Sequence, residues 1–367
     1  MTNLRIPGPT PLPPAVVEAG TREMINHRGP EFAAIITDVT KRLKRWFQTE
    51  QDLFLFPSSG TGGLEAAVVN SFSPGETVLG ISIGVFGDRF REIGEAYGLN
   101  VIHMDVPWGH AADANDVSSL LDQHPDVKGV LITHNETSTG VMNDIRSVGE
   151  AIRGRALYLV DGVSSVGGVP IETDAWGIDI LVSGSQKAWM VPPGVSMVSV
   201  SQRAWEANRN AKLPRYYWDF KRAKSYLERN QTFTTPTLSV FYALQAGLDM
   251  MDAEGMDAVF ARHRRVAEFT RAGITQLGLQ LFAEPSHASD LVTAVKMPEG
   301  VDGSALSKAM RTERNIVLGG GQAGLTGKIF RIGHMGYVKE ADIEDVLVSL
   351  EAILPRLRQG AHAVTAG

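Results

Sequence analysis

The sequence predicts an α/β fold whose large domain is built on a mostly parallel, seven-stranded sheet. Two observations lead to this prediction. Short apolar runs rich in β-branched residues recur through the first 200 residues, and helical patterns separate most of them. After Pro236 the pattern of apolar residues changes to one typical of long helices and shorter strands. Strands that alternate with amphipathic helices are typical of a parallel sheet covered by helices on both faces.

The elements follow in chain order. The first 14 residues are expected to be extended, because five prolines between Pro7 and Pro14 disfavour a helix. Helices are then expected over residues 15–24 and 30–46. The seven strands are expected at 53–56, 77–81, 101–104, 127–133, 157–160, 178–182 and 196–200. The helices between them are expected at 63–71, 88–97, 117–123 and 145–153.

The last third of the chain predicts a smaller α+β domain. Two long helices, 237–253 and 256–277, are separated by Gly255. Short strands near 280–282, 293–297, 316–318 and 329–332 and helices at 303–314 and 339–354 complete it. We therefore divide the chain into an extended segment 1–14, a large domain 15–255 and a small C-terminal domain 256–367.

Composition narrows the classes of function. The chain has 367 residues, 43% of them apolar, and a net charge of −6, which suits a soluble globular protein and argues against a nucleic-acid partner. It has no cysteine, which excludes disulfides, thiolate metal sites and a cysteine nucleophile. The nine histidines show no metal-type spacing. With no signal peptide and no apolar stretch of membrane-spanning length, a cytoplasmic protein without a membrane partner is expected.

The segment 178–194 carries the most informative single residue. An apolar strand is followed by small polar residues and then by Lys187. Pro192-Pro193-Gly194 is expected to form a turn after it. Burial disfavours a charged lysine, so we expect the pKa of Lys187 to lie below the usual value of about 10.4. Such an amine can form a Schiff base. A lysine that merely extends to solvent is the alternative for this stretch taken alone.

Ligands gather at the carboxyl ends of strands in parallel sheets, so the residues that follow each strand matter. Small residues at 57–63, among them Ser59, Gly60 and Thr61, precede a helix and predict an anion site; helix capping is the alternative. Phe86 lies in a glycine-flanked turn and could present its ring to a planar ligand; a residue of the hydrophobic core is the alternative. Asp161 ends an apolar strand, where an unpaired carboxylate is costly, so it needs a partner or caps a helix.

One cofactor accounts for all four features. Pyridoxal 5'-phosphate requires an anion site, a stacking face, a carboxylate for its pyridine nitrogen and a lysine for its aldehyde. The freed amine of Lys187 would then be the base that moves the substrate α-proton.

The same segments resemble the class V aminotransferases of pyridoxal-phosphate fold type I, in particular the alanine–glyoxylate / serine–pyruvate aminotransferase group. The resemblance rests on matching stretches in the family's order. They are P-G-P-T at 7–10, S-S-G-T-G-G-L-E-A-A at 58–67, T-H-N-E-T-S-T-G-V at 133–141, V-D-G-V-S-S-V-G-G at 160–168, S-G-S-Q-K-A at 183–188 with P-P-G at 192–194, and F-R-I-G-H-M-G at 330–336.

The resemblance implies a role for each matching residue. Lys187 would hold the cofactor covalently, and Asp161 would bind its pyridine nitrogen. Arg331 would bind the substrate α-carboxylate, for which a guanidinium provides a two-pronged donor. Gly8 is expected at the substrate, which places the segment 1–14 near the active site. The remaining cofactor-binding residues are expected to be Ser59, Gly60, Thr61, Phe86, Thr137, Val163, Gln186 and Thr234.

The resemblance also implies a homodimer with shared active sites, in which Thr234 reaches the phosphate of the neighbouring subunit. The expected reaction transfers the amino group of alanine or serine to glyoxylate or pyruvate. Alternatives within the family are (S)-ureidoglycine and aspartate as donors. The absence of a second well-placed arginine argues against aspartate. A pyridoxal-phosphate lyase and a non-catalytic binding protein are further alternatives. A G-x-G-x-x-G at 319–324 leads into a strand rather than a helix, which disfavours a dinucleotide site.

Overall fold

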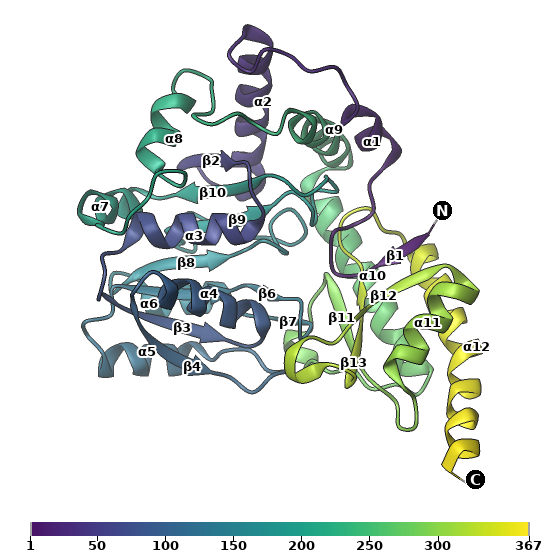
Figure 1. Ribbon diagram of the computed structural model, residues 1–367. Coiled ribbons are helices and arrows are strands. Elements are labelled where there is room, and N and C mark those ends of the chain that lie inside the picture. The colour runs from purple at the N-terminus through teal and green to yellow at the C-terminus, as the bar shows by residue number, and fades with distance from the viewer. Residues whose placement is uncertain (1, 366–367) are drawn as a thin grey trace.

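The computed structural model describes residues 2–365. Its larger sheet has seven strands in the order β2-β10-β9-β8-β5-β3-β4 (Figure 1). All neighbouring pairs are parallel except those of β10, which is antiparallel to both β9 and β2. The prediction of a mostly parallel seven-stranded sheet is confirmed. The strands are β2 (Asp52–Phe56), β3 (Thr77–Ser82), β4 (Asn100–Asp105), β5 (Gly129–Thr133), β8 (Leu157–Asp161), β9 (Ile180–Gly184) and β10 (Ser196–Val200).

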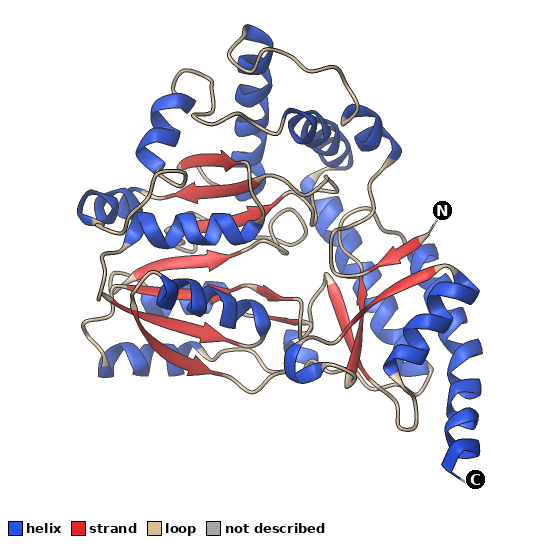
Figure 2. Ribbon diagram, viewed as in Figure 1, coloured by secondary structure: helices blue, strands red, loops and turns tan. Residues whose placement is uncertain are grey.

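Helices cover both faces of this sheet, as Figure 2 shows. Alternate strand residues serve two separate cores: Leu55 and Leu79 pack in one, Phe54 and Val78 in the other. This division reflects the two-residue period of a strand, whose side chains point to opposite faces. One core takes side chains from α1 (Pro14–Ala19), α2 (Pro30–Phe47), α5 (Ala114–Gln123), α6 (Ile145–Ile152) and α9 (Leu238–Glu254). The other takes them from α3 (Gly60–Ser71), α4 (Val85–Ala96), α7 (Gln202–Asn210) and α8 (Phe220–Leu227).

The C-terminal third forms a second sheet of four strands in the order β1-β12-β13-β11. Its first strand comes from the other end of the chain: β1 (Asn3–Arg5) pairs in parallel with β12. The elements of this part are α10 (Met256–Gln276), β11 (Val292–Lys296), α11 (Gly303–Arg314), β12 (Ile316–Gly320), β13 (Ile329–Gly333) and α12 (Glu340–Thr365). The domain limits at residues 14 and 255 stay a prediction.

Two predicted elements were wrong in extent. The helix expected over residues 15–24 ends at Ala19, because only Val16 and Ala19 of its helical residues are buried and the following residues 21–24 are all exposed. The strand expected at 280–282 is reduced to a single bridge between Leu281 and Val295. Elements that were not predicted are α7, α8, the hairpin of β6 (Asn135–Glu136) and β7 (Val141–Met142), and the 3-10 turns η1 (Pro285–His287) and η2 (Ala323–Leu325). No helix within residues 2–365 is long and apolar enough to cross a membrane.

Candidate active site

Lys187 lies in the turn that follows β9. The backbone of Met190 adopts a left-handed conformation (φ 61°) and its N–H donates to the Lys187 carbonyl over 3.1 Å, which closes a tight turn. The Nζ atom of Lys187 donates to the carbonyl oxygen of Pro7 at 2.9 Å. Burial lowers the pKa of Lys187 to about 8; the Asp161 carboxylate opposes this shift, and the Arg331 guanidinium adds to it. The amine is therefore partly unprotonated near neutral pH.

The N-terminal segment packs directly on this lysine. Gly8 has a φ of +138°, and a Cβ atom at that position would lie 2.8 Å from Nζ of Lys187. Thr10 fixes the same contact, because its N–H donates to the Gln186 carbonyl at 3.1 Å and its hydroxyl donates to the Lys187 carbonyl at 2.9 Å. Only glycine combines this backbone conformation with so close an approach. Residues 7–10 thus form one wall around the amine.

Asp161 ends β8 and is only 4% exposed. Its Oδ1 atom accepts a hydrogen bond from the Val163 N–H at 2.9 Å, whereas Oδ2 has only the hydroxyl of Thr133 at 3.5 Å. Within residues 2–365 no basic side chain forms an ion pair with this carboxylate. Burial raises the pKa of Asp161 to about 6, against the effect of the Val163 N–H. A buried carboxylate in this state gains free energy from a cationic partner.

The start of α3 lies close to Asp161 through Val163. A Cβ atom at Gly60 would be 2.4 Å from a methyl carbon of Val163, so glycine is needed for this approach. Ser59 occupies the N-cap position without a side-chain hydrogen bond, and Thr61 follows in the first turn. The Gln186 side-chain oxygen is buried and has no partner among the described residues. A helix N-terminus left open in this way attracts an anion.

Phe86 begins α4, and a buried glutamate holds its backbone. Glu136 is 0% exposed, and its Oε2 accepts hydrogen bonds from the N–H groups of Phe86 at 2.9 Å and Gly87 at 3.1 Å. The other oxygen accepts from the N–H and hydroxyl of Ser138 at 3.0 and 2.6 Å. Burial raises the pKa of Glu136, against these hydrogen bonds. The carboxylate thereby replaces the missing N-cap side chain of α4.

We expect Glu136→Gln to lower the free energy of unfolding by about 1–3 kcal/mol. The amide NH₂ group of glutamine would face backbone N–H groups, so buried donors would be left without an acceptor. Urea denaturation of the cofactor-free protein measures this. Glu92→Gln is the matched control, since Glu92 lies exposed on α4, the helix whose start Glu136 holds. Equal stability of the two variants would contradict the structural role of Glu136.

Arg331 lies on β13 and is 7% exposed. Its guanidinium donates to the carbonyls of Gly320 and Thr137, both at 2.8 Å, and to the side-chain oxygen of Gln322 at 3.1 Å. All of these acceptors are neutral, and within the described residues no carboxylate pairs with Arg331. Burial lowers the pKa of Arg331 to about 10. The site therefore holds a buried cation that can bind an anionic ligand.

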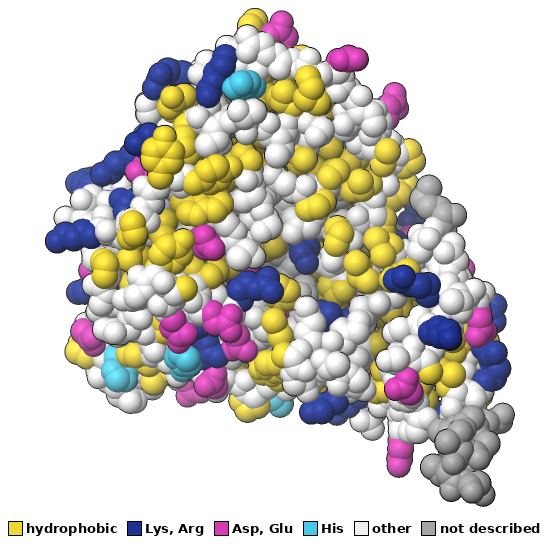
Figure 3. Space-filling model, viewed as in Figure 1, with side chains coloured by type: hydrophobic (Ala, Val, Ile, Leu, Met, Phe, Trp, Pro, Cys, Tyr) yellow, Lys and Arg dark blue, Asp and Glu magenta, His cyan; other side chains and the backbone are white. Residues whose placement is uncertain are grey.

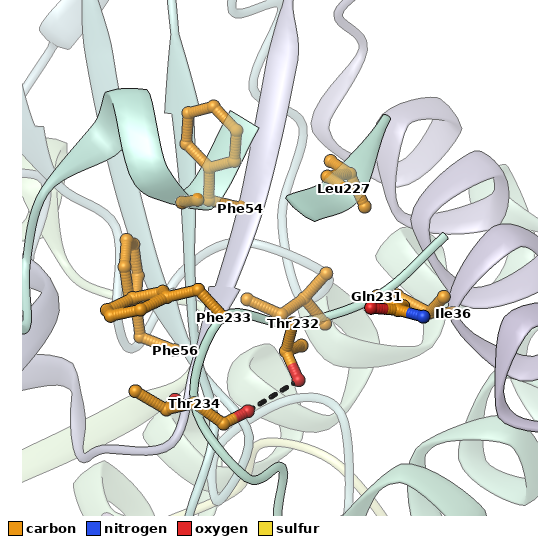
Figure 4. A pocket seen from close by; sticks show the side chains of 10 residues that line it. Ile36, Phe54, Phe56, Leu227, Gln231, Thr232, Phe233 and Thr234 are labelled. Atoms are coloured by element: carbon orange, nitrogen blue, oxygen red, sulfur yellow. Dashed lines mark hydrogen bonds between the residues drawn. The ribbon is translucent and has the colours of Figure 1, made fainter. Parts of the chain in front are cut away.

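We call Gly8, Phe86, Asp161, Lys187 and Arg331 the Lys187 cluster. Of the other predicted site residues, the contacts above tie Gly60, Thr137, Val163 and Gln186 to its surroundings. Ser59 and Thr61 flank Gly60 at the start of α3. Thr234 lies elsewhere: it lines a small apolar pocket beside α2 and α8, where the Thr232 hydroxyl donates to its carbonyl at 2.7 Å (Figure 4). No hydrogen bond within residues 2–365 joins Thr234 to the cluster.

Sequence reasoning missed three residues at this site. Glu136 gives the clearest signal, since it is the one charged residue between Gly129 and Asn143. Gln322 lies in the glycine-rich segment 319–324, for which the sequence pattern only disfavoured a dinucleotide site. Arg89 has no motif of its own; its charge acts on both Asp161 and Lys187.

Two sheets in this arrangement, with a lysine after β9 and an aspartate at the end of β8, define the architecture of the fold type I aminotransferases. The solved alanine–glyoxylate aminotransferase from Nostoc sp. superposes with a TM-score of 0.93 and 32% identity, covering 96% of this chain and 95% of that one. The chain belongs to the class V aminotransferases: the family model Aminotransferase class-V matches residues 3–346.

Two curated relatives have different names. The L-aspartate–glyoxylate aminotransferase of Paracoccus denitrificans is 38% identical over 96% of this chain and 91% of its own length. A protein named soluble hydrogenase, small subunit, from Synechococcus sp. (strain PCC 6716) is 42% identical over 96% and 93%.

Proposed function

We propose that this protein is a pyridoxal-phosphate-dependent transaminase that moves the amino group of alanine or serine to glyoxylate or pyruvate. The observation that carries the proposal is that one site contains two basic residues. Arg331 is buried and has no carboxylate partner among the described residues, and the amine of Lys187 has a pKa of about 8. A binding protein needs no such amine. A transaminase needs a base near neutral pH and a cation for the substrate carboxylate.

The residues present fit pyridoxal phosphate. Oδ2 of Asp161 accepts only a long hydrogen bond from the Thr133 hydroxyl at 3.5 Å, so it can also accept one from the ring nitrogen. The open start of α3 with Ser59 is suited to the phosphate. Phe86 and Val163 are both partly exposed and supply apolar surfaces for the ring. When bound, the cofactor withdraws electrons from the substrate α-carbon.

The chain's own residues then orient the substrate and move the proton. Arg331 binds the α-carboxylate, and the Gln322 oxygen that contacts it gives way to the stronger acceptor. Nζ of Lys187 takes the proton from the α-carbon of the donor and gives it up within the first half of the reaction. In the second half, which runs in reverse, the same atom delivers a proton to the α-carbon of the new amino acid. With a pKa of about 8, roughly one lysine in ten is unprotonated at pH 7, against fewer than about one in a thousand for an ordinary lysine.

The experiment that tests this proposal is a visible absorbance spectrum of the cofactor-loaded protein, recorded as L-alanine, L-serine and then glyoxylate are added. We expect the cofactor band to bleach with alanine or serine and to return with glyoxylate or pyruvate. Bleaching only with (S)-ureidoglycine or aspartate would assign one of the alternative donors. Release of ammonia without return of the band would identify a lyase. A protein that takes up no cofactor would overturn the proposal.

We also propose a homodimer in the cytoplasm. Large apolar side chains are exposed in the single chain, among them Met24 at 63% and Tyr216 at 68%. Figure 3 shows apolar side chains gathered over much of the larger part of the molecule on the face drawn. Such surfaces favour association with a second copy. The partner's Thr234 would then complete the phosphate site, as the family resemblance implies.

A further inference from the structure

Arg89 lies on α4, one turn beyond Phe86. The carbon at the centre of its guanidinium is 4.8 Å from the centroid of the Phe86 ring. The guanidinium therefore lies over the ring of Phe86, the residue that we assign to cofactor stacking. The backbone of Phe86 is held by the buried Glu136, which accepts a hydrogen bond from its N–H at 2.9 Å. The Arg89 guanidinium therefore contacts a residue of the cluster whose backbone is anchored.

The guanidinium has no anionic partner within residues 2–365, although acids and another arginine lie nearby. Asp88, the preceding residue, pairs with Arg91 and accepts from the Ser82 hydroxyl at 2.8 Å. Arg91 also pairs with Asp105 at 2.6 Å. The local acids are thus engaged by Arg91, and Arg89 is left with the aromatic contact alone. A partly buried arginine without an acceptor favours binding of an anion.

The contact with Phe86 places Arg89 next to a residue of the Lys187 cluster, and its charge acts on two other residues of that cluster. Its charge lowers the pKa of Asp161 and of Lys187, in each case as a smaller contribution than burial. Glu136 is the other nearby acid, and its two oxygens are occupied by backbone and Ser138 donors. Asp161, the acid of the cluster itself, forms no ion pair with Arg89 and is assigned above to the ring nitrogen of the cofactor.

We propose that Arg89 binds the distal carboxylate of a dicarboxylic amino acid, so that this enzyme also accepts a donor such as aspartate. This inference rests on the proposed transaminase function. Each other charge already has a counterpart there: Asp161 for the ring nitrogen, the α3 N-terminus for the phosphate and Arg331 for the α-carboxylate. Arg89 is the cation left over. The sequence argues against aspartate because it shows no second well-placed arginine. Arg89 would be that arginine, although no sequence motif marks it.

Binding of unreactive acids to the cofactor-loaded enzyme tests the proposal without turnover. Isothermal titration calorimetry compares succinate, which has two carboxylates, with propionate, which has one. In wild type we expect succinate to bind at least tenfold more tightly, as a charge-assisted hydrogen bond provides. Arg89→Gln should remove this preference, and Arg89→Lys should restore part of it. Equal affinities for the two acids in wild type would overturn the inference.

A matched control is available on α8. Arg222 also lies over an aromatic ring, with its guanidinium carbon 4.4 Å from the Tyr216 centroid, so Arg222→Gln removes the same charge and the same kind of contact. It should keep the preference for succinate. Loss of the preference in both variants would show a general effect of net charge and would contradict a site at Arg89.

Kinetics separate this inference from the proposed function. The ratio of kcat/KM for L-aspartate to that for L-alanine should fall at least tenfold in Arg89→Gln, mainly through KM for aspartate. An unchanged ratio in an active enzyme defeats the role of Arg89 alone. Weaker cofactor binding in the variant, with the ratio unchanged, would reassign Arg89 to the cofactor. Failure of wild type to react with any donor would instead defeat the proposed function.

Discussion

Lys187→Ala is expected to abolish amino transfer while the protein still folds. The side chain makes one hydrogen bond, from Nζ to the Pro7 carbonyl, and its burial in a charged form is unfavourable. Its removal therefore costs little stability, whereas the reaction loses both the covalent anchor and the base. A general base alone accounts for a factor of about 10²–10⁴, so the combined loss should exceed about 10⁴ in kcat.

Two measurements check this result. Borohydride reduction of the loaded wild type should fix the cofactor to the peptide containing Lys187, and mass spectrometry of Lys187→Ala should find no fixed cofactor. Lys308→Ala removes an exposed lysine from α11 and should match wild type in activity and labelling. Turnover in Lys187→Ala above a hundredth of wild type would refute the assignment.

Asp161→Asn is expected to move stability and activity in opposite directions. The folded-state pKa of Asp161, about 6, lies above the value of 3.8 for an unperturbed aspartate. The folded protein therefore binds more protons between about pH 4 and pH 6. The stability of the cofactor-free wild type should fall as pH rises through that window. Above about pH 6 the folded protein bears the whole free-energy cost of a buried, ionised Asp161. Two pKa units correspond to about 3 kcal/mol, so the neutral variant should be about 1–3 kcal/mol more stable at pH 8.

The loaded enzyme should show the opposite effect. Asparagine keeps an acceptor for the Val163 N–H but carries no negative charge for a ring cation. We expect kcat to fall by a factor of about 10²–10³ and the cofactor to bind more weakly. Urea denaturation at pH 5 and pH 8, cofactor titration and half-reaction rates provide the readouts. Asp345→Asn, an exposed change on α12, is the control. A variant that is less stable without cofactor would contradict the account of Asp161.

The sequence predicted the seven strands of the large sheet well, because most are short apolar runs buried on both faces, as β5 and β8 are throughout. The edge strand β4 is the exception, since only Met104 in it is buried. It did not predict α7 and α8, which lie between Val200 and Pro236. Both helices are mostly exposed and polar, with Ala204 and Asn208 the buried residues of α7 and Phe220 that of α8. Elements with so little buried surface leave a weak periodic pattern.

At the site, residues at strand ends were predicted and residues that act through tertiary packing were not. Lys187 and Asp161 follow strands, so topology alone brings them to one edge of the sheet. Glu136 matters because α4 presents two N–H groups to it, and Arg89 because Phe86 lies beside it. Those relations depend on how α4 packs, which no local pattern encodes. The roles assigned to the predicted site residues stay predictions.

The pairing of β1 with β12 has a consequence for biosynthesis. Residues 3–5 leave the ribosome first, but their partner strand begins at Ile316. β1 therefore cannot pair until most of the chain has been synthesised. At synthesis rates of about 5–20 residues per second, that interval lasts roughly 15–60 s. The wall that Gly8 forms against Lys187 belongs to the same segment. Until β12 has been synthesised, β1 lacks its partner strand, and the segment that carries Gly8 lacks this anchor beside Lys187.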